Sequence, residues 1–520
     1  MTAVSTLPDD IEALKRLLLQ RDATIARLIT EIARLKRWHY GRSAERLDGD
    51  ARAQMPRALG DLQAAHAPAV EAPPALPVND STQACDPAQA NRRAYPPRRA
   101  PRSFAEHLPR ETVVYPPALC TCPECGAALR KLGEDVSETL DFVPGYFKVI
   151  RHVRPKLSCG HCATIVQQPA PSRPIERGMA APGLLAQVLV SKYADHCPLY
   201  RQAGIYRRAG VELERATLAD WVAHTARLVA PLADAVGRHV LAGDKVHGDD
   251  TPVPVLDPGR GRTRTGRLWA YVRDDRPAAS RTPPAVWYRY SPDRKGLHPQ
   301  QHLRHFRGIL QADAYTGYGP LYVDGRIVEA ACWAHARRKF YDIHGANQSP
   351  LAAEAMRRIG RLYAIERDIR GRLPDERRAV RQVRAAPLLV DLYDWLGATL
   401  GTVSAKSDLA RAIQYALVRW PALTRYRDDG RIEIDNNSAE RAIRPLVLGR
   451  RNYLFAGSNA GGEHAANLYS LIGTALLNGI EPYAYLRHVL ERIADYRIDR
   501  IADLLPWNVR LAKPLEQLSA

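Results

Sequence analysis

A series of β-strand patterns beginning near Lys245 constrains most strongly what this chain can fold into. These segments are rich in branched and aromatic side chains, and the first three are separated by short turns, which predicts an antiparallel meander. The expected order is three strands, a helix and two more strands, over residues 246–256, 266–272, 285–290, 294–306, 308–313 and 327–334. Asp249 lies in the first strand and Asp313 ends the fourth. The sequence therefore predicts an α/β region with acidic side chains on two strands.

A second stretch, residues 432–458, combines amide, acidic and basic side chains. Asn436 and Asn437 are turn and N-cap residues, so a helix is expected to begin here, with Glu440 in its first turn. One interpretation of Glu440 is a capping box with Asn437 and an ion pair with Arg444. The other makes it the third member of an acidic set with the two upstream aspartates. Both interpretations stay open at this point.

Length and charge limit the classes of function. The 520 residues exceed one ordinary core, and 75 Lys and Arg against 56 Asp and Glu give a formal net charge of +19. Such a basic excess indicates nucleic acid first and an anionic membrane surface second. No apolar run reaches roughly 18 residues, so we expect no transmembrane helix. The first ten residues lack the apolar segment of a secretory signal, and we expect a cytoplasmic protein.

The N-terminal region predicts a helix followed by a linker. Apolar residues recur at a and d positions over 11–35, interrupted by Arg21, which predicts a coiled coil within residues 1–47. An amphipathic helix packed on its own domain would give a similar pattern. Residues 48–110 are rich in Ala, Pro and small polar side chains and end in a basic run, which is typical of a disordered linker.

Four cysteines predict a metal module over residues 111–175. Cys122 and Cys125 form one pair, Cys159 and Cys162 form another, and each pair lies on a glycine-containing turn. Two such pairs supply four thiolates for one tetrahedral structural Zn²⁺. Cys120 could replace Cys122 as a ligand. Clustered cysteines suit metal ligation in a reducing cytosol better than a disulfide framework.

Helical patterns surround the predicted strands. Residues 202–210 and 213–221 resemble two helices joined by a tight glycine turn, the pattern of a helix-turn-helix, in which Thr217 would begin the recognition helix. Any helical hairpin gives the same pattern. Residues 349–420 are helical in pattern, so a helical insertion separates the fifth strand from Glu440.

Five motifs together are similar to the insertion-sequence-66 (IS66) family, which belongs to the DDE transposases. They are HGDDTP at 247–252, DAYTGY at 313–318, CWAHARRKF at 332–340, DNNSAERAIRP at 435–445 and LFAGS at 454–458. The resemblance extends over nearly the whole length. Two residues depart from the family pattern: Asp250 stands where glutamate is common, and Arg451 where lysine is common.

The resemblance implies a multidomain α/β plus α protein with a ribonuclease H-like catalytic core, a pattern that the strand order also favours. The expected regions are a zipper-like helix (1–47), a linker (48–110), a zinc module (111–175), a helix-turn-helix-like DNA-binding segment (176–240), the catalytic domain (241–460) with an insertion at about 349–428, and C-terminal helices (461–520).

By the same resemblance, Asp249, Asp313 and Glu440 are catalytic residues that bind Mg²⁺ or Mn²⁺. Two such ions about 3.5–4 Å apart can activate water and stabilise a leaving 3′ oxygen, and hard cations prefer oxygen ligands. Neighbouring strand residues point to opposite faces, so only one of Asp249 and Asp250 should reach the metal, and the motif favours Asp249.

The expected partner is double-stranded DNA, both the terminal inverted repeats of the element and its target. Arginines in or near these motifs would hold its phosphates: Arg441, Arg444, Arg450, Arg451, Arg337 and Arg338. The resemblance also implies a homodimer or higher oligomer, accessory proteins of the same element, and a place at the bacterial nucleoid rather than at a membrane.

Two other functions are alternatives to strand cleavage and strand transfer. One is a DNA-binding relic that no longer cuts, against which an intact acidic triad argues. The other is a ribonuclease-H-type nuclease, for which the zipper and zinc module have no evident purpose. Cys332 and His335 form a further pair, which alone cannot close a zinc site, so a structural or DNA-positioning role is favoured.

Overall fold

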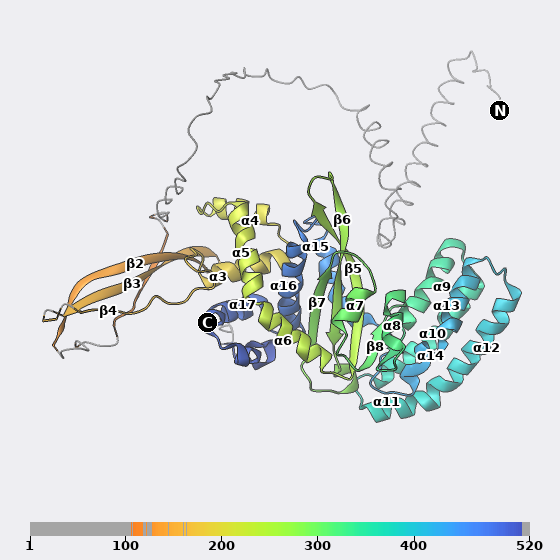
Figure 1. Cartoon of the computed structure of the whole chain (residues 1–520). Helices are drawn as coiled ribbons and strands as arrows, with labels where there is room; N and C mark the ends of the chain where they lie inside the picture. Colours follow the sequence, from red (N-terminus) through yellow and green to blue (C-terminus); the bar gives the residue numbers. More distant parts are fainter. Residues whose placement is uncertain are drawn as a thin grey trace, which may run out of the picture. The chain divides into compact units, whose positions relative to one another are not determined.

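A computed structural model describes residues 104, 106, 108–117, 121, 127–143, 145–159, 161–162 and 164–511 (Figure 1). The coiled coil expected over 11–35, nearly all of the linker, and Cys120, Cys122 and Cys125 lie outside these residues. The residues described fall within one unit of the chain.

A four-stranded sheet comes first. Its strands are β1 (Arg110–Val114), β2 (Leu129–Val143), β3 (Tyr146–Cys159) and β4 (Ile165–Gln167). β2 and β3 form a long antiparallel ribbon in which Val143 faces Tyr146 and Leu129 faces Cys159, while β1 runs parallel to β3. Gly145 has φ +106°, which the tight turn between the two strands requires. The alternation of apolar side chains in β3 buries Phe147, Val149 and Val153 on one face.

Four helices follow this sheet: α3 (Pro182–Tyr193), α4 (Leu199–Arg208), α5 (Arg215–Leu228) and α6 (Ala230–Leu241). Asp141 of β2 accepts a hydrogen bond from the Leu184 backbone N–H at 3.1 Å and so satisfies the first turn of α3. The two helices of the helix-turn-helix pattern are α4 and α5, and the turn between them contains Gly210 at φ +79°. Leu218 and Trp221 of α5 are buried.

The central sheet has five strands in the order β7-β6-β5-β8-β9. They are β5 (Lys245–Asp257), β6 (Arg262–Arg273), β7 (Ala285–Ser291), β8 (Gly308–Ala312) and β9 (Ile327–Ala330). β5, β6 and β7 pair antiparallel, whereas β8 runs parallel to both β5 and β9. Pro252 and Pro254 lie beyond Gly248, the last residue of β5 that pairs with β8. Proline has no backbone N–H, and at these positions β8 has no carbonyl that would need one.

Two expected elements are shorter than the sequence suggests. The helix expected over 294–306 is α7 (Leu297–His302), and the fifth strand, expected within 327–334, starts at Ile327 and ends at Ala330. The strand stops because Cys332 is already the N-cap residue of α9 (Trp333–Asn347). The connection between β8 and β9 contains the short helix α8 (Gly319–Tyr322).

The edge strand β7 is covered by α16 (Asn459–Leu477) (Figure 1). Ser470 Oγ accepts a hydrogen bond from the Tyr288 N–H at 2.8 Å, and Thr474 Oγ1 accepts one from the Val286 N–H at 3.1 Å. The Thr474 hydroxyl also donates to the Val286 carbonyl. Helical side chains therefore satisfy backbone groups that an exposed sheet edge would leave open.

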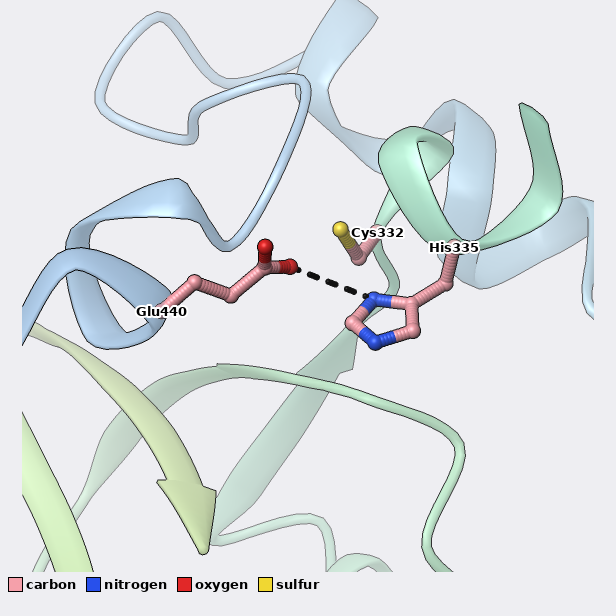
Figure 2. A group of neighbouring side chains, drawn as sticks. All are labelled: Cys332, His335 and Glu440. Atoms are coloured by element: carbon pink, nitrogen blue, oxygen red, sulfur yellow. Dashed lines mark ion pairs between the residues drawn. The ribbon is translucent and has the colours of Figure 1, made fainter. Parts of the chain in front are cut away.

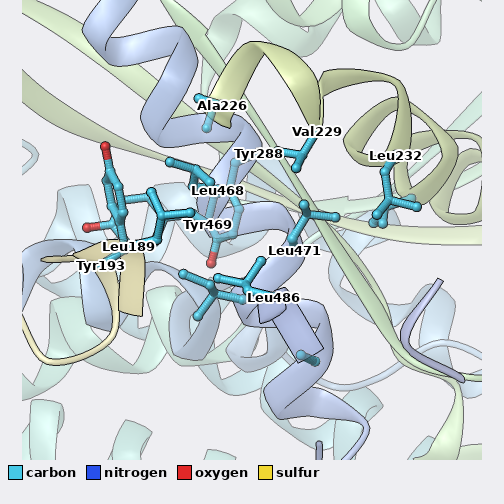
Figure 3. Close-up of a cluster of buried hydrophobic side chains, with 14 of the residues drawn as sticks. Leu189, Tyr193, Ala226, Val229, Leu232, Tyr288, Leu468, Tyr469, Leu471 and Leu486 are labelled. Atoms are coloured by element: carbon cyan, nitrogen blue, oxygen red, sulfur yellow. The ribbon is translucent and has the colours of Figure 1, made fainter. Parts of the chain in front are cut away.

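One hydrophobic core joins the helices before the sheet to those after it (Figure 3). Leu189 of α3, Val229 beside α6, Tyr288 of β7 and Leu471 of α16 are buried within it. Leu486 adds α17 (Pro482–Leu490). Residues on both sides of positions 240 and 460 therefore share one core.

A second core lies in the helical insertion and also includes buried residues of α9 and Ile309 of β8. After α9 its helices are α10 (Pro350–Ile369), α11 (Pro374–Val380), α12 (Ala386–Thr402), α13 (Asp408–Val418) and α14 (Trp420–Thr424), with a π-helical turn at Arg381–Ala385. Arg381 is fully buried and donates to both Glu366 oxygens at 2.8 and 2.6 Å. It also donates to the carbonyls of Tyr426, Asp429 and Ile432.

We predict that Arg381→Ala destabilises the insertion by about 3–5 kcal/mol, because it leaves Glu366 charged and buried without its main partner. Arg384→Ala is the matched control from the same turn, since its pair with Asp368 is half exposed and contributes about 0–1 kcal/mol. Urea unfolding followed by tryptophan fluorescence measures both. Equal midpoints for the two variants would contradict the assignment.

Candidate active site

Asp249 lies within β5 and Asp313 directly follows β8, at the same level of two neighbouring parallel strands. The register pairs Gly248 of β5 with Ala312 of β8, and each aspartate is the next residue along its chain. Asp249 Oδ1 accepts a hydrogen bond from the Asp250 N–H at 2.8 Å, and Asp313 Oδ1 accepts one from the Tyr315 N–H at 3.1 Å. The strand pairing thus brings two carboxylates from distant parts of the sequence together.

Asp250, the next residue, is held by two arginines. Its side chain is 1% exposed, and its two oxygens bind Arg267 Nη1 at 2.9 Å and Arg294 Nη2 at 2.8 Å. The two ion pairs therefore engage both oxygens of the Asp250 carboxylate. Arg294 also approaches Asp313, with its Nη2 3.8 Å from Oδ2, and so links the two acidic positions.

Glu440 comes from the first turn of α15 (Asn437–Gly449). The N-cap residue is Asn436 instead of Asn437, and its side chain makes no capping hydrogen bond. Glu440 Oε1 lies 3.5 Å from Nδ1 of His335, which belongs to the first turn of α9. The charge of Glu440 contributes to the raised pKa of Asp249, which ties the three acids into one electrostatic group.

The segment before α15 is held by buried polar contacts. Gln311 of β8 exchanges two hydrogen bonds with the Glu433 backbone, donating from Nε2 to its carbonyl and accepting from its N–H. The Trp333 backbone N–H donates to the Ile434 carbonyl at 3.1 Å. The segment is therefore fixed both to the sheet and to the start of α9.

Asn436 makes the last connection before the helix. Its Nδ2 donates to the Gly248 carbonyl at 2.8 Å, and its Oδ1 accepts from His247 Nδ1 at 3.1 Å. Its backbone N–H donates to Cys332 Sγ at 3.1 Å. Asn436 is fully buried, so these bonds are formed without competition from water.

Sequence reasoning missed Gln311, Arg294 and the tertiary role of Asn436. A signal for Gln311 was present, because a polar residue inside an otherwise apolar strand requires a buried partner. The bonds of Arg294 to Asp250 and of Asn436 to Gly248 join residues far apart in the chain, and local patterns do not predict them.

The acidic group is electrostatically unfavourable by itself. Burial first, then the charges of Asp313 and other nearby acids, raises the pKa of Asp249 well above its ordinary value. Burial also raises the pKa of Asp313, an effect that His335 and Arg294 partly oppose. Grouped carboxylate oxygens are the donors that hard divalent cations prefer, and such a cation would relieve their repulsion. The donor set therefore fits the expected Mg²⁺ or Mn²⁺.

The arginines expected to bind DNA lie on α9, on α15 and just after it. Arg337, Arg338, Arg444 and Arg451 are exposed. Arg441 donates to Ser438 Oγ at 3.3 Å. Arg450 donates to the Pro252 carbonyl and therefore also braces β5.

In the cysteine module, the structure describes only the second pair. Cys159 is the buried last residue of β3, and Cys162 is exposed, with its Sγ 3.2 Å from Thr164 Oγ1. Thr121 and Ala128 form a bridge on either side of the first pair, next to Leu129, which pairs with Cys159.

Comparison with known proteins agrees with this architecture. Residues 177–464 match the family described as Transposase IS66 family, and residues 120–163 match the zinc-finger binding domain of transposase IS66. Residues 470–507 match the IS66 C-terminal element, and 27–113 match the description Transposase C of IS166 homeodomain. The chain belongs to the IS66 transposase family, as the sequence motifs indicated.

Relatives of similar length occur in Sinorhizobium fredii. The uncharacterized protein y4hP is 43% identical over 429 residues, covering 79% of this chain and 77% of its own. The uncharacterized protein y4jD is 39% identical over 511 residues, covering 96% and 97%. Among the residues that the structure describes, no helix is long and apolar enough to cross a membrane.

The two adjacent aspartates predict opposite effects on stability. A raised folded-state pKa means that ionised Asp249 destabilises the fold, a cost absent below the unfolded pKa and complete above the folded pKa. Asp249→Asn should therefore raise the melting temperature without divalent metal, by an amount that shrinks as the pH falls. Asp250→Asn should lower it, because Arg267 and Arg294 lose their shared anion.

Thermal melts in a metal chelator, from acidic to neutral pH, measure both effects. Mg²⁺ should then stabilise the unmodified protein more than Asp249→Asn. Shifts of the same sign for the two variants at neutral pH would show that the aspartates do not differ as described.

Proposed function

We propose that this protein is a DDE transposase that binds the terminal inverted repeats of its insertion sequence, cleaves DNA strands there and joins the freed ends to target DNA. The observation that carries this proposal is the convergence of Asp249, Asp313 and Glu440 from β5, the end of β8 and α15. Membership of the IS66 transposase family supports the same chemistry.

The catalytic domain is a ribonuclease H-like core. Three antiparallel strands followed by two parallel ones, in the order β7-β6-β5-β8-β9, support this assignment. The helical insertion between β9 and α15 supplies Glu440 with a fixed approach to the sheet, because Arg377 of the insertion binds Glu433 at 2.9 Å just before α15.

Asp249, Asp313 and Glu440 would hold two Mg²⁺ or Mn²⁺ ions, which when bound activate water and stabilise the leaving 3′ oxygen. The residues of the chain do the positioning. Asn436 sets the start of α15 against β5, and Arg294 binds the Asp250 carboxylate, which would leave Asp249 as the metal ligand of the two. No serine, tyrosine or cysteine nucleophile is needed for this reaction.

DNA binding is assigned to basic surfaces and separate modules. Exposed arginines on α9 and near α15 would contact phosphates beside the acids, and α4 with α5 would read the element ends. Cys122, Cys125, Cys159 and Cys162 would bind one structural Zn²⁺, which the zinc-finger match over 120–163 supports.

Self-association follows from the same function. Two element ends must be held together before cutting, and the predicted coiled coil over 11–35 is the simplest means of making a homodimer or higher oligomer. Accessory proteins of the same element are expected partners. Strand cleavage and strand transfer would take place on the bacterial chromosome in the cytoplasm.

A DNA-binding relic is the less favoured alternative. Three acids grouped near buried sheet residues cost stability and repel phosphate, and mere DNA binding gains nothing from them. A ribonuclease-H-type nuclease would use the same acids but needs neither a zinc-finger region nor a zipper-like one.

The test is cleavage of DNA carrying the element's own ends, with and without Mg²⁺. Glu440→Gln keeps the shape of the side chain but makes a poor ligand for a hard cation, so we expect cleavage to fall at least roughly 100-fold. The melting temperature should change little and DNA binding should persist. Glu463→Gln, an exposed position near the start of α16, is the matched control and should cleave normally.

A Glu440→Gln protein that cleaves at the rate of Glu463→Gln would remove Glu440 from the metal site. Mg²⁺-independent cleavage by the unmodified protein would overturn the metal-dependent reaction itself.

A further inference from the structure

A second group of ligand-type side chains lies beside the acidic site. Cys332, His335 and Glu440 each offer one ligand atom, and these three atoms all lie within 4.8 Å of one another (Figure 2). Cys332 is the N-cap residue of α9, His335 follows three positions later, and Glu440 faces them from α15. We refer to these three residues as the Cys332 cluster.

Hydrogen bonding does not account for the position of His335. Its Nδ1 is buried and makes no hydrogen bond within the described part of the chain, although Glu440 Oε1 lies 3.5 Å away as an ion-pair partner. Figure 2 shows Nδ1 directed toward the Glu440 carboxylate, with the Cys332 sulfur on the same side. A buried ring nitrogen without a hydrogen bond costs free energy that a bound cation would recover.

The chemistry of this cluster differs from that of the neighbouring aspartates. A thiol, an imidazole and a carboxylate form the mixed donor set of Zn²⁺ and related soft or borderline ions, whereas Mg²⁺ prefers oxygen donors only. Three protein ligands leave the fourth tetrahedral position for water, as in open zinc sites rather than closed structural ones.

We propose that the Cys332 cluster is a binding site for Zn²⁺-type divalent ions, distinct from the four-cysteine module. Cys332 is 1% exposed, so the ion must displace a proton from a thiol that burial keeps neutral.

The consequence for cleavage rests on the proposed function. Glu440 belongs both to the Cys332 cluster and to the acidic triad, so an ion in the cluster draws its carboxylate away from Asp249 and Asp313. Zinc in excess of the amount that the four-cysteine module takes should therefore inhibit Mg²⁺-dependent cleavage.

Metal content of the full-length protein after equilibration with buffered Zn²⁺ tests the site directly. Cys332→Ser and His335→Asn should each bind one zinc ion fewer per chain than the unmodified protein. Serine at 332 can still accept the hydrogen bond from the Asn436 N–H but does not replace a thiolate ligand. Cys197→Ser is the matched control, because this half-buried cysteine lies between α3 and α4, outside the cluster.

Equal zinc content in the unmodified protein, Cys332→Ser and His335→Asn would overturn the proposal, as would a similar loss in Cys197→Ser. His335→Asn changes a partly exposed side chain, so it keeps the test valid if Cys332→Ser folds poorly.

Cleavage in Mg²⁺ with increasing Zn²⁺ gives a separate measurement, with each variant compared with its own zinc-free rate. The unmodified protein should lose activity at zinc concentrations that Cys332→Ser and His335→Asn tolerate. If the unmodified protein cleaves no DNA in any condition, the proposed function fails, while the metal content still decides whether the Cys332 cluster binds zinc.

Discussion

The buried polar contacts of residues 432–436 are the constraint on which the site depends. Glu440 follows Asp313 by more than a hundred residues, most of them in the helical insertion, so the chain must return to the sheet at a defined place. Gln311 binds the Glu433 backbone from β8, Asn436 binds β5, and Arg377 holds Glu433 from the insertion. Because these groups are buried, leaving any one unpaired is costly, and this specifies a single path into α15.

The order of the elements could be predicted, because the central strands form apolar runs bounded by turns. Their ends could not be predicted as well. The fifth strand stops at Ala330 because Cys332 already begins a helix, and the helix expected over 294–306 shortens to Leu297–His302. Leu189, Tyr288 and Leu471 come from three regions that the sequence pattern distinguishes, and all three lie in one core. Packing between distant segments decides such boundaries, and local propensity carries no information about it.

The acidic residues could be proposed from motifs, but their surroundings could not. Strand alternation predicts that Asp249 and Asp250 point to opposite faces, and the structure adds that Asp250 is paired with Arg267 and Arg294. The two interpretations of Glu440 could not be separated by sequence, because both use the first turn of a helix. In the structure Asn436 is the N-cap residue of α15, and its amide binds β5 and makes no capping hydrogen bond. The sequence could not show that His335 lies beside Glu440, because the two residues come from α9 and α15, which are far apart in the chain (Figure 2).

The central claim is that the contact of Asn436 with β5 positions Glu440. The rate of DNA cleavage by Asn436→Ala tests this claim most directly. The substitution leaves all three acids in place but removes the bonds to Gly248 and His247, and a displacement of about 1 Å at a catalytic group can cost on the order of 100-fold in rate. We expect a loss of that size at a temperature where the variant is folded. Asn437→Ala, which removes a hydrogen bond to Asp435 two residues earlier, should retain most activity. Equal rates for the two folded variants would contradict the account.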